Sequence, residues 1–122
     1  YLSTALGYTR WSAYYPGSDA AADVEAYICD DPQATFMVQS SGTAIGLADI
    51  GINADFTLGT GSTRTGQSGA SLDQGTLADT ATLPFRVISL VEGVGPGADI
   101  TTSYNRVIVC WNDQFLRQMT GI

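Results

Sequence analysis

Alternation of apolar and polar residues is the clearest structural signal in the sequence. Val24, Ala26 and Ile28 alternate with more polar neighbours, and this period of two predicts a half-buried β-strand. The same period recurs along the chain, while the segment 82–92 is apolar on both faces, as in a strand covered on both sides. Strands are therefore expected at residues 23–28, 34–39, 52–58, 70–73, 82–92 and 104–111.

Turn-forming residues separate these predicted strands. Asp30, Asp31 and Pro32 stand between the first two strands, where Pro fixes φ and Asp can accept hydrogen bonds from nearby backbone N–H groups. We therefore expect the first two strands to form a β-hairpin. Residues 59–69, with the sequence GTGSTRTGQSG, are expected to form a long surface loop.

Short strands joined by Gly and Pro turns favour an all-β antiparallel fold, because parallel strands need long crossover connections. We predict six or seven short strands with long Gly/Ser/Thr loops, arranged as a jelly-roll-like β-sandwich or, alternatively, as a small β-barrel. The length of the chain favours a single domain over residues 1–122. Residues 1–16 fit no regular pattern and are expected to form an irregular N-terminal arm.

The composition excludes several classes of enzyme and partner. The chain has no His, and all five of its basic residues are Arg. It therefore has no Ser-His-Asp triad, no imidazole-ligated zinc, and no lysine for a Schiff base or a P-loop. The net charge of −7 argues against binding to nucleic-acid phosphates or to an anionic membrane surface. We expect neither nucleic acid nor a membrane as a partner.

The two cysteines, Cys29 and Cys110, each lie near the end of an apolar, strand-like run. Free Cys is among the residue types most often buried. Two reduced, buried thiols are therefore expected in preference to a single disulfide, which is the alternative.

Two groups of acidic residues are possible catalytic pairs. Asp23 and Glu25 share one face of a predicted strand, and Asp30 adjoins Asp31. Glycoside hydrolysis needs two carboxyl groups about 5–10 Å apart, which residues two apart on a strand approach. A solvated strand face and a turn cap are the structural explanations, and we favour them. The chain is therefore predicted not to be an enzyme.

A third set of oxygen-bearing side chains is a possible calcium site. Asp49, Asn53 and Asp55 lie within seven residues, as calcium ligands do in a binding loop. They do not match the order of the calcium-loop motif, and Asn53 and Asp55 could simply form the polar face of a strand. We predict no metal and no cofactor.

Aromatic side chains are concentrated near the N-terminus, where four of them lie within eight positions. They could cover one end of the core, bury at a protein interface or stack on sugars. The loop at 59–69 has a single charge, Arg64, and is either a mobile surface loop or a partner-contacting loop anchored by this Arg. The candidate interface residues are Tyr8, Arg10, Trp11, Tyr14, Tyr15 and Arg64.

Three stretches together resemble a known family. They are YYPGSDAAADVEAYICDDPQATFMVQ, ADFTLGTGSTRTGQSGASLD and the closing LPFRVISLV…YNRVIVCWNDQFLRQMTGI. They are similar to small structural proteins of tailed bacteriophages, the decoration or cement proteins of the capsid. The resemblance covers residues 14–122 and is carried by the DDP element, the GTGSTRTGQSGASLD segment and the TG near the C-terminus.

The resemblance implies a β-rich, non-enzymatic virion protein. Such a protein assembles in the bacterial cytoplasm, binds the outer surface of the icosahedral head, and holds subunits of the major capsid protein together. Because decoration proteins lie on symmetry axes, we expect a homo-oligomer, with a dimer preferred and a trimer as the alternative. Arg10 and Arg64 are expected at the interface with the shell or a sister chain, and Trp11 is expected to be the main apolar anchor.

Two other classes of function remain open from the sequence. A carbohydrate-binding β-sandwich module is the alternative, and it rests on the N-terminal aromatic residues. An acid-dependent hydrolase rests on the carboxylate pairs and has the weakest support.

Overall fold

The computed structural model describes residues 2–3, 7–15, 24–93, 95, 98–118 and 120–121. Within these residues the protein is all-β, with antiparallel sheets, two short 3₁₀ helices and no α-helix. Neither of the described helices is long and apolar enough to cross a membrane. The chain divides into two compact units: unit 1 comprises Tyr1–Cys29 and Gly59–Gly69, and unit 2 comprises Asp30–Leu58 and Ala70–Ile122. The prediction of a single domain with an N-terminal arm stays a prediction.

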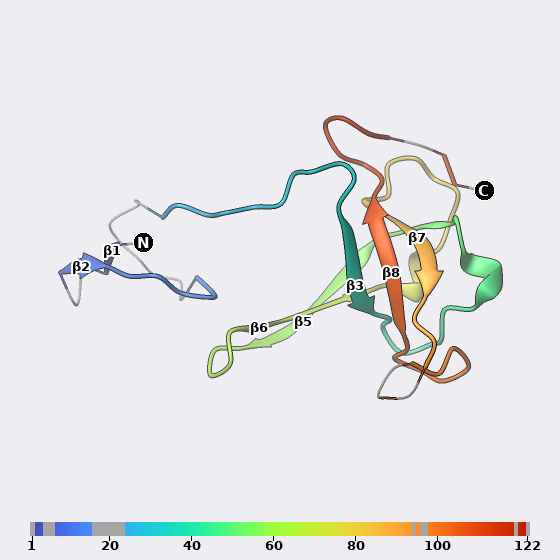
Figure 1. Ribbon diagram of the computed structural model, residues 1–122, viewed down its shortest axis with the longest axis horizontal. Helices are drawn as coiled ribbons and strands as arrows, with labels where there is room; N and C mark the ends of the chain where they lie inside the picture. The colour runs from blue at the N-terminus through green and yellow to red at the C-terminus, as the bar shows by residue number, and fades with distance from the viewer. Residues whose placement is uncertain are drawn as a thin grey trace. The chain divides into compact units, whose positions relative to one another are not determined.

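A four-stranded antiparallel sheet forms the centre of unit 2 (Figure 1). Its order is β3-β8-β7-β4, so the last strand of the chain lies between β3 and β7. The register sets Phe36 of β3 opposite Val109 of β8, and Val109 opposite Val87 of β7. The bounds are β3 (Thr35–Gln39), β4 (Asn53–Ala54), β7 (Phe85–Leu90) and β8 (Arg106–Trp111).

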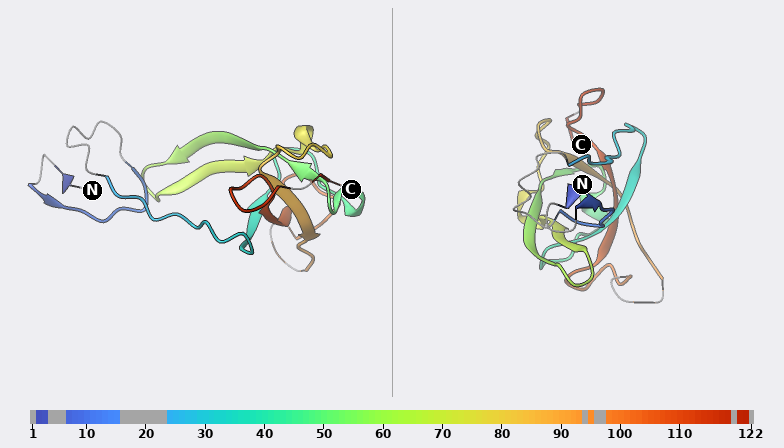
Figure 2. Two further views of the ribbon diagram at one scale, coloured as in Figure 1. Left: turned by 90° about the horizontal axis from the view of Figure 1, so that it is seen from above. Right: turned by 90° about the vertical axis from the view of Figure 1, so that its left-hand side faces the viewer.

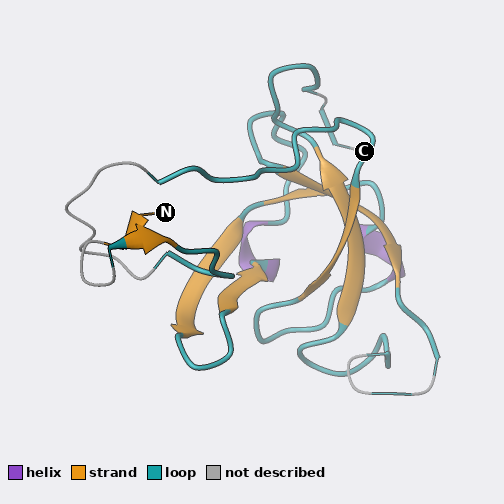
Figure 3. Ribbon diagram, turned by 60° about the vertical axis from the view of Figure 1, so that its left-hand side comes forward, coloured by secondary structure: helices purple, strands orange, loops and turns teal. Residues whose placement is uncertain are grey.

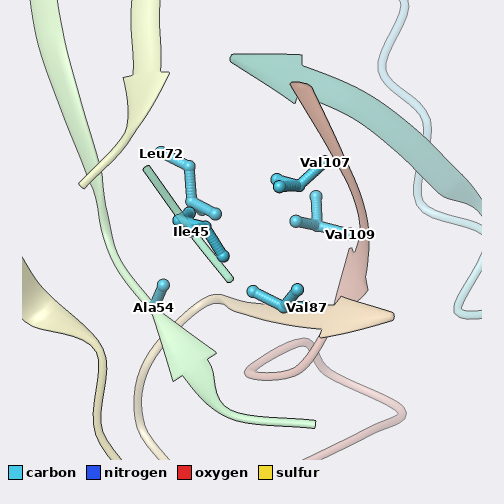
Figure 4. Packing of buried hydrophobic residues seen from close by; sticks show 6 residues of the cluster. All are labelled: Ile45, Ala54, Leu72, Val87, Val107 and Val109. Carbon is cyan, nitrogen blue, oxygen red and sulfur yellow. The ribbon is translucent and has the colours of Figure 1, made fainter. Parts of the chain in front are cut away.

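The hydrophobic core lies against one face of this sheet (Figure 4). Val107 and Val109 of β8 and Val87 of β7 are fully buried, because alternate residues of a strand point to the same face. A β-bulge between Val87 and Ser89 shifts the register of β7. The core residues are Ile45, Ala54, Leu72, Val87, Val107 and Val109.

Aromatic rings extend this core at one end of the sheet. Trp111 stacks on Phe85 with ring centroids 5.0 Å apart, and Phe36 meets Trp111 edge-on at 5.2 Å. Phe56 meets Phe85 edge-on at 6.0 Å. Such offset and edge-on pairs each contribute about 0.5–1.5 kcal/mol beyond the area they bury.

Buried asparagines hold the loops of unit 2 to the sheet. The side chain of Asn105 donates to the carbonyl of Ile45 (2.8 Å) and accepts from the N–H of Ile45 (3.0 Å), although the two residues are 60 positions apart. Asn112 donates to the carbonyls of Ala81 and Leu83 at 2.9 and 3.0 Å. These bonds satisfy backbone groups that lie outside any sheet.

A hairpin outside the four-stranded sheet joins β5 (Phe56–Ser62) to β6 (Gln67–Leu72) (Figure 2). Two glycines face each other across it, and a Cβ on Gly69 would lie 2.6 Å from the carbonyl atoms of Gly59. The two strands can approach this closely only because neither position carries a side chain. In unit 1, β1 (Leu2–Ser3) pairs with β2 (Tyr8–Thr9), also antiparallel.

The structure confirms the strands expected at 34–39, 82–92 and 104–111, with shorter bounds. Asp31 closes the predicted turn by accepting a hydrogen bond from the N–H of Gln33 at 2.8 Å. The segment at 52–58 is divided between β4 and β5. Loops occupy much of the remaining described chain (Figure 3). The two 3₁₀ helices are η1 (Leu47–Asp49), within residues 40–51, and η2 (Gln74–Thr76).

Two predictions about elements were wrong. Residues 24–30 form no strand and are exposed, so the expected hairpin with β3 is absent; β3 pairs instead with β8, whose buried valines offer a stronger apolar face. Asp23, at the start of that predicted strand, lies outside the described residues. The expected loop at 59–69 is mostly hairpin, because facing glycines allow close strand pairing and confine the turn to residues 63–66.

Replacement of Asn105 by Ala should lower the free energy of unfolding by about 3 kcal/mol, because the buried N–H and C=O of Ile45 lose their partners. Urea unfolding followed by tryptophan fluorescence measures the change. The control is Gln118→Ala, which removes an exposed side-chain hydrogen bond to Asp113 and should cost less than about 0.5 kcal/mol. Equal losses in the two variants would contradict this role for Asn105.

Candidate functional site

All six candidate interface residues belong to unit 1. Five of them come from residues 8–15, and Arg64 comes from the turn of the β5–β6 hairpin. The four aromatic side chains are all exposed, and Trp11 is the most exposed of them at 76%. The sequence left three possibilities for these aromatic residues, one of which was that they cover an end of the core. For Trp11 that possibility is wrong, because most of its side chain is exposed.

The aromatic segment forms one side of a cleft of about 510 Å³. Residues 9–15 line it from one stretch of chain, and residues 24–27 line it from another. Trp11 and Tyr27 face each other in the cleft with ring centroids 5.6 Å apart and planes tilted by 34°. Because these two rings contact each other, the stacking surfaces that the cleft offers to a flat apolar group are the parts of the rings turned away from the pair.

Tyr27 also lines the cleft, although the sequence did not predict it as an interface residue. The alternation expected at 23–28 puts Tyr27 on the polar, exposed face, and 74% of its surface is indeed exposed, but its ring also packs against Trp11. The available signal was an aromatic residue among the acidic residues of that face. A single exposed aromatic residue is common on protein surfaces, so only its contact with Trp11 makes Tyr27 part of an exposed aromatic patch.

The hairpin turn that carries Arg64 lies against the aromatic segment within unit 1. Gly66, at φ +72°, closes this turn, and its N–H donates to the carbonyl of Ser62 at 2.8 Å. A Cβ at Gly66 would lie 3.0 Å from Cβ of Ala13 and 3.4 Å from Cδ1 of Tyr14. Glycine is therefore required here both by the left-handed backbone and by close packing, and this packing brings the Arg64 turn to the candidate site.

The cleft also has charged groups of both signs, since Arg10 and Glu25 are among its lining residues. Among the lining residues that the structure describes, Glu25 is the only carboxylate, and its predicted partner Asp23 lies outside the described residues. The aromatic residues of this lining can stack on a ligand, and its polar residues can donate hydrogen bonds to it and accept hydrogen bonds from it. The lining shows no second carboxylate beside Glu25 for general acid–base chemistry.

The two carboxylates of the possible calcium site accept hydrogen bonds from nearby backbone N–H groups. Asp49 accepts from the N–H of Gly46 at 2.7 Å, and Asp55 accepts from the N–H of Phe56 at 2.7 Å. Asn53 was expected on a polar strand face, but it is fully buried and accepts from Nε of Arg86 at 2.9 Å. Among the described residues, no three His, Cys, Asp or Glu side chains gather as metal ligands.

One carboxyl group of unit 2 has a shifted pKa. The hydroxyl of Thr101 donates to Asp99 at 2.7 Å and the N–H of Thr101 donates at 2.8 Å. The two bonds stabilise the carboxylate and lower the pKa of Asp99, with the hydroxyl as the larger cause. Asp99 is fully exposed in a turn, so this shift marks local turn geometry.

Both cysteines are free thiols, as expected, but they differ in exposure. Cys110 lies in β8 and is buried, whereas Cys29 is exposed. The prediction of burial was therefore wrong for Cys29. The physical reason is that the strand expected at 23–28 does not form, so Cys29 has no sheet to pack against.

No known protein family, curated protein or solved structure was found to match the chain. The resemblance to bacteriophage decoration proteins therefore stays a prediction.

The difference in thiol exposure predicts one fast-reacting cysteine per native chain. Ellman's reagent should modify Cys29 readily in buffer, and Cys110 only after unfolding in denaturant, because a buried thiol is shielded from the reagent. The variant Cys29→Ser isolates the two signals and should lose all native reactivity. Fast labelling of native Cys29→Ser, or no labelling of the native wild type, would contradict the assignment.

Proposed function

We propose that this protein is a decoration protein of a bacteriophage capsid, which binds the outer surface of the icosahedral head and stabilises contacts between major capsid protein subunits. The observation that carries the proposal is the exposed aromatic cleft of unit 1, with Trp11 at 76% exposure facing Tyr27. Large aromatic side chains and Arg are the residue types that dominate binding energy at protein interfaces.

The distribution of charge supports binding through unit 1. Unit 1 has two Arg and three acidic residues in its sequence, whereas unit 2 has three Arg and nine acidic residues. In unit 2, Arg86 donates to the carbonyl of Thr120 and Arg117 to the carbonyl of Pro32. An acidic shell would repel unit 2 far more strongly than unit 1, so Arg10 and Arg64 are proposed to face the shell or a sister chain.

In this proposal the protein assembles with the head in the bacterial cytoplasm. Its partners are the major capsid protein and other copies of itself. A homodimer is preferred, and a trimer would suit a site on a local three-fold axis. The antiparallel sheets and the short strands support a jelly-roll-like sandwich, with a small barrel as the alternative.

Carbohydrate binding is the second candidate function, and the composition of the cleft favours it. Trp11 and Tyr27 offer aromatic faces, and Glu25 and Arg10 offer hydrogen-bonding groups beside them. Aromatic side chains combine an apolar face with a polar edge, which suits the mixed surface of a sugar ring. A decoration protein with such a cleft could carry both functions.

Replacement of Trp11 by Ala should weaken binding to shells of the major capsid protein by about 2 kcal/mol, roughly thirtyfold in Kd. The fold should be unaffected, because the side chain is mostly exposed. Co-sedimentation of purified protein with shells measures the change. Arg64→Ala should have a smaller effect, as expected for a solvent-exposed charge at the rim.

The matched control for Trp11 is Phe115→Ala. Phe115 is an aromatic side chain with 98% exposure in unit 2, so its removal should leave shell binding unchanged. The proposal fails if the wild-type protein does not sediment with shells, or if Trp11→Ala and Phe115→Ala bind as the wild type does.

Glycan arrays separate the second candidate from the first. If the cleft binds sugars, the wild-type protein should bind a defined group of glycans, and both Trp11→Ala and Tyr27→Ala should lose at least about tenfold in affinity, because each removes one stacking face. Glycan binding that survives both substitutions would place any sugar site outside the cleft.

A further inference from the structure

Residues 24–29 have the sequence of a β-strand but lie outside every strand that the structure describes. Val24, Ala26 and Ile28 alternate with more polar neighbours, which is the pattern of a strand half buried on a sheet. In the structure this stretch is exposed and is drawn without a strand arrow (Figure 1). The sheet that its pattern requires is therefore not supplied by the described part of its own chain.

The backbone of this stretch is available for pairing. Among the described residues, no hydrogen bond joins the backbone of residues 24–29 to another segment. Such bonds begin at Asp30, the first residue of unit 2, whose carbonyl accepts from Nε2 of Gln114. An extended stretch with free N–H and C=O groups can add as a strand to an exposed sheet edge of another protein.

The apolar side chains of the stretch are also exposed to water. Ile28 is 81% exposed and Val24 is 43% exposed. These residues and Ala26 are spaced two apart, so in an added strand they would all point to one face of the sheet. If that face borders an apolar surface, pairing would remove the three side chains from water together.

We propose that residues 24–28 bind as an added strand on an exposed edge strand of the major capsid protein. The backbone groups of alternate residues would pair with that edge, and Val24, Ala26 and Ile28 would pack on an apolar surface beside it. The inference rests on the proposed function, and it states how unit 1 attaches to the shell.

The position of the stretch favours the shell protein as its partner. Residues 24–27 line the same cleft as Trp11, so the added strand would extend the surface that is proposed to face the shell. Main-chain pairing gives affinity without opposite charges. This suits a chain with a net charge of −7 and only five Arg that binds an acidic shell.

A second copy of this chain is a poorer partner for the strand. Both edges of its four-stranded sheet already meet other parts of the chain. Leu72 pairs with Ser40 and accepts from the N–H of Ser41 at 2.8 Å, and Ala78 pairs with Asn53. That sheet therefore offers no fully open edge to a strand from a sister chain.

Proline substitution tests the strand, because Pro removes one backbone N–H and is tolerated in an extended chain wherever that N–H faces solvent. Only alternate residues of an added strand direct their N–H groups to the host edge. Of Glu25→Pro and Ala26→Pro, one should therefore weaken co-sedimentation with shells at least about tenfold, and the other less than about threefold. Glu25→Ala keeps the N–H and measures the effect of the carboxylate by itself.

Replacement of an apolar side chain tests the packing. Ile28→Ser should weaken shell binding about tenfold, and urea unfolding should be unchanged because the side chain is exposed in the free protein. Leu116→Ser makes a similar change at a residue of unit 2 that is 69% exposed, and it should leave the Kd within about twofold.

Three results would overturn the proposal. Equal effects of the two Pro variants, or equal binding by Ile28→Ser and Leu116→Ser, would overturn this inference alone if Trp11→Ala still weakens shell binding. A dimer of the free protein that Ile28→Ser dissociates would place the strand on a second copy instead. A wild type that does not sediment with shells would overturn the proposed function, and this inference with it.

Discussion

The reciprocal hydrogen bonds between the Asn105 side chain and the backbone of Ile45 hold the sheet and the loops of unit 2 together. The buried core is small, with Val107 and Val109 on the central strand, and much of the surrounding backbone is irregular. Irregular backbone can lie against a core only if its polar groups have partners. Asn105 supplies them for the segment that carries Ile45 into the core, so packing and polar satisfaction depend on each other here.

Hydrophobic periodicity predicted the strands whose faces are buried and missed what depends on long-range pairing. β8 and β3 followed from alternation, since a buried face leaves a period of two in the sequence. The run at 24–28 has the same period, but no sheet buries it. The hairpin at 59–69 has almost no apolar residues, so no period of two marks its strands. Its pairing depends instead on the close approach of two facing glycines. Buried asparagines were equally hidden, since polarity alone predicts exposure.

The candidate site was predicted in its residue types and only partly in its geometry. Trp11 and Arg64 could be singled out by residue type, as an aromatic and an Arg in irregular segments, and the structure places both in unit 1. The sequence could not identify Tyr27, because the contact with Trp11 joins segments that no local pattern relates. Gly66 was counted as a loop residue, yet its packing against Ala13 and Tyr14 brings the Arg64 turn to the aromatic segment.

The central claim is that unit 1 is the part of the chain that binds the capsid. Hydrogen–deuterium exchange measured by mass spectrometry, on the free protein and on the protein bound to shells, tests it most directly. The account predicts that binding slows exchange in residues 8–15, 24–28 and 59–69, with the core strands β7 and β8 unchanged. Slower exchange confined to the loops of unit 2, with those three segments unaffected, would contradict it.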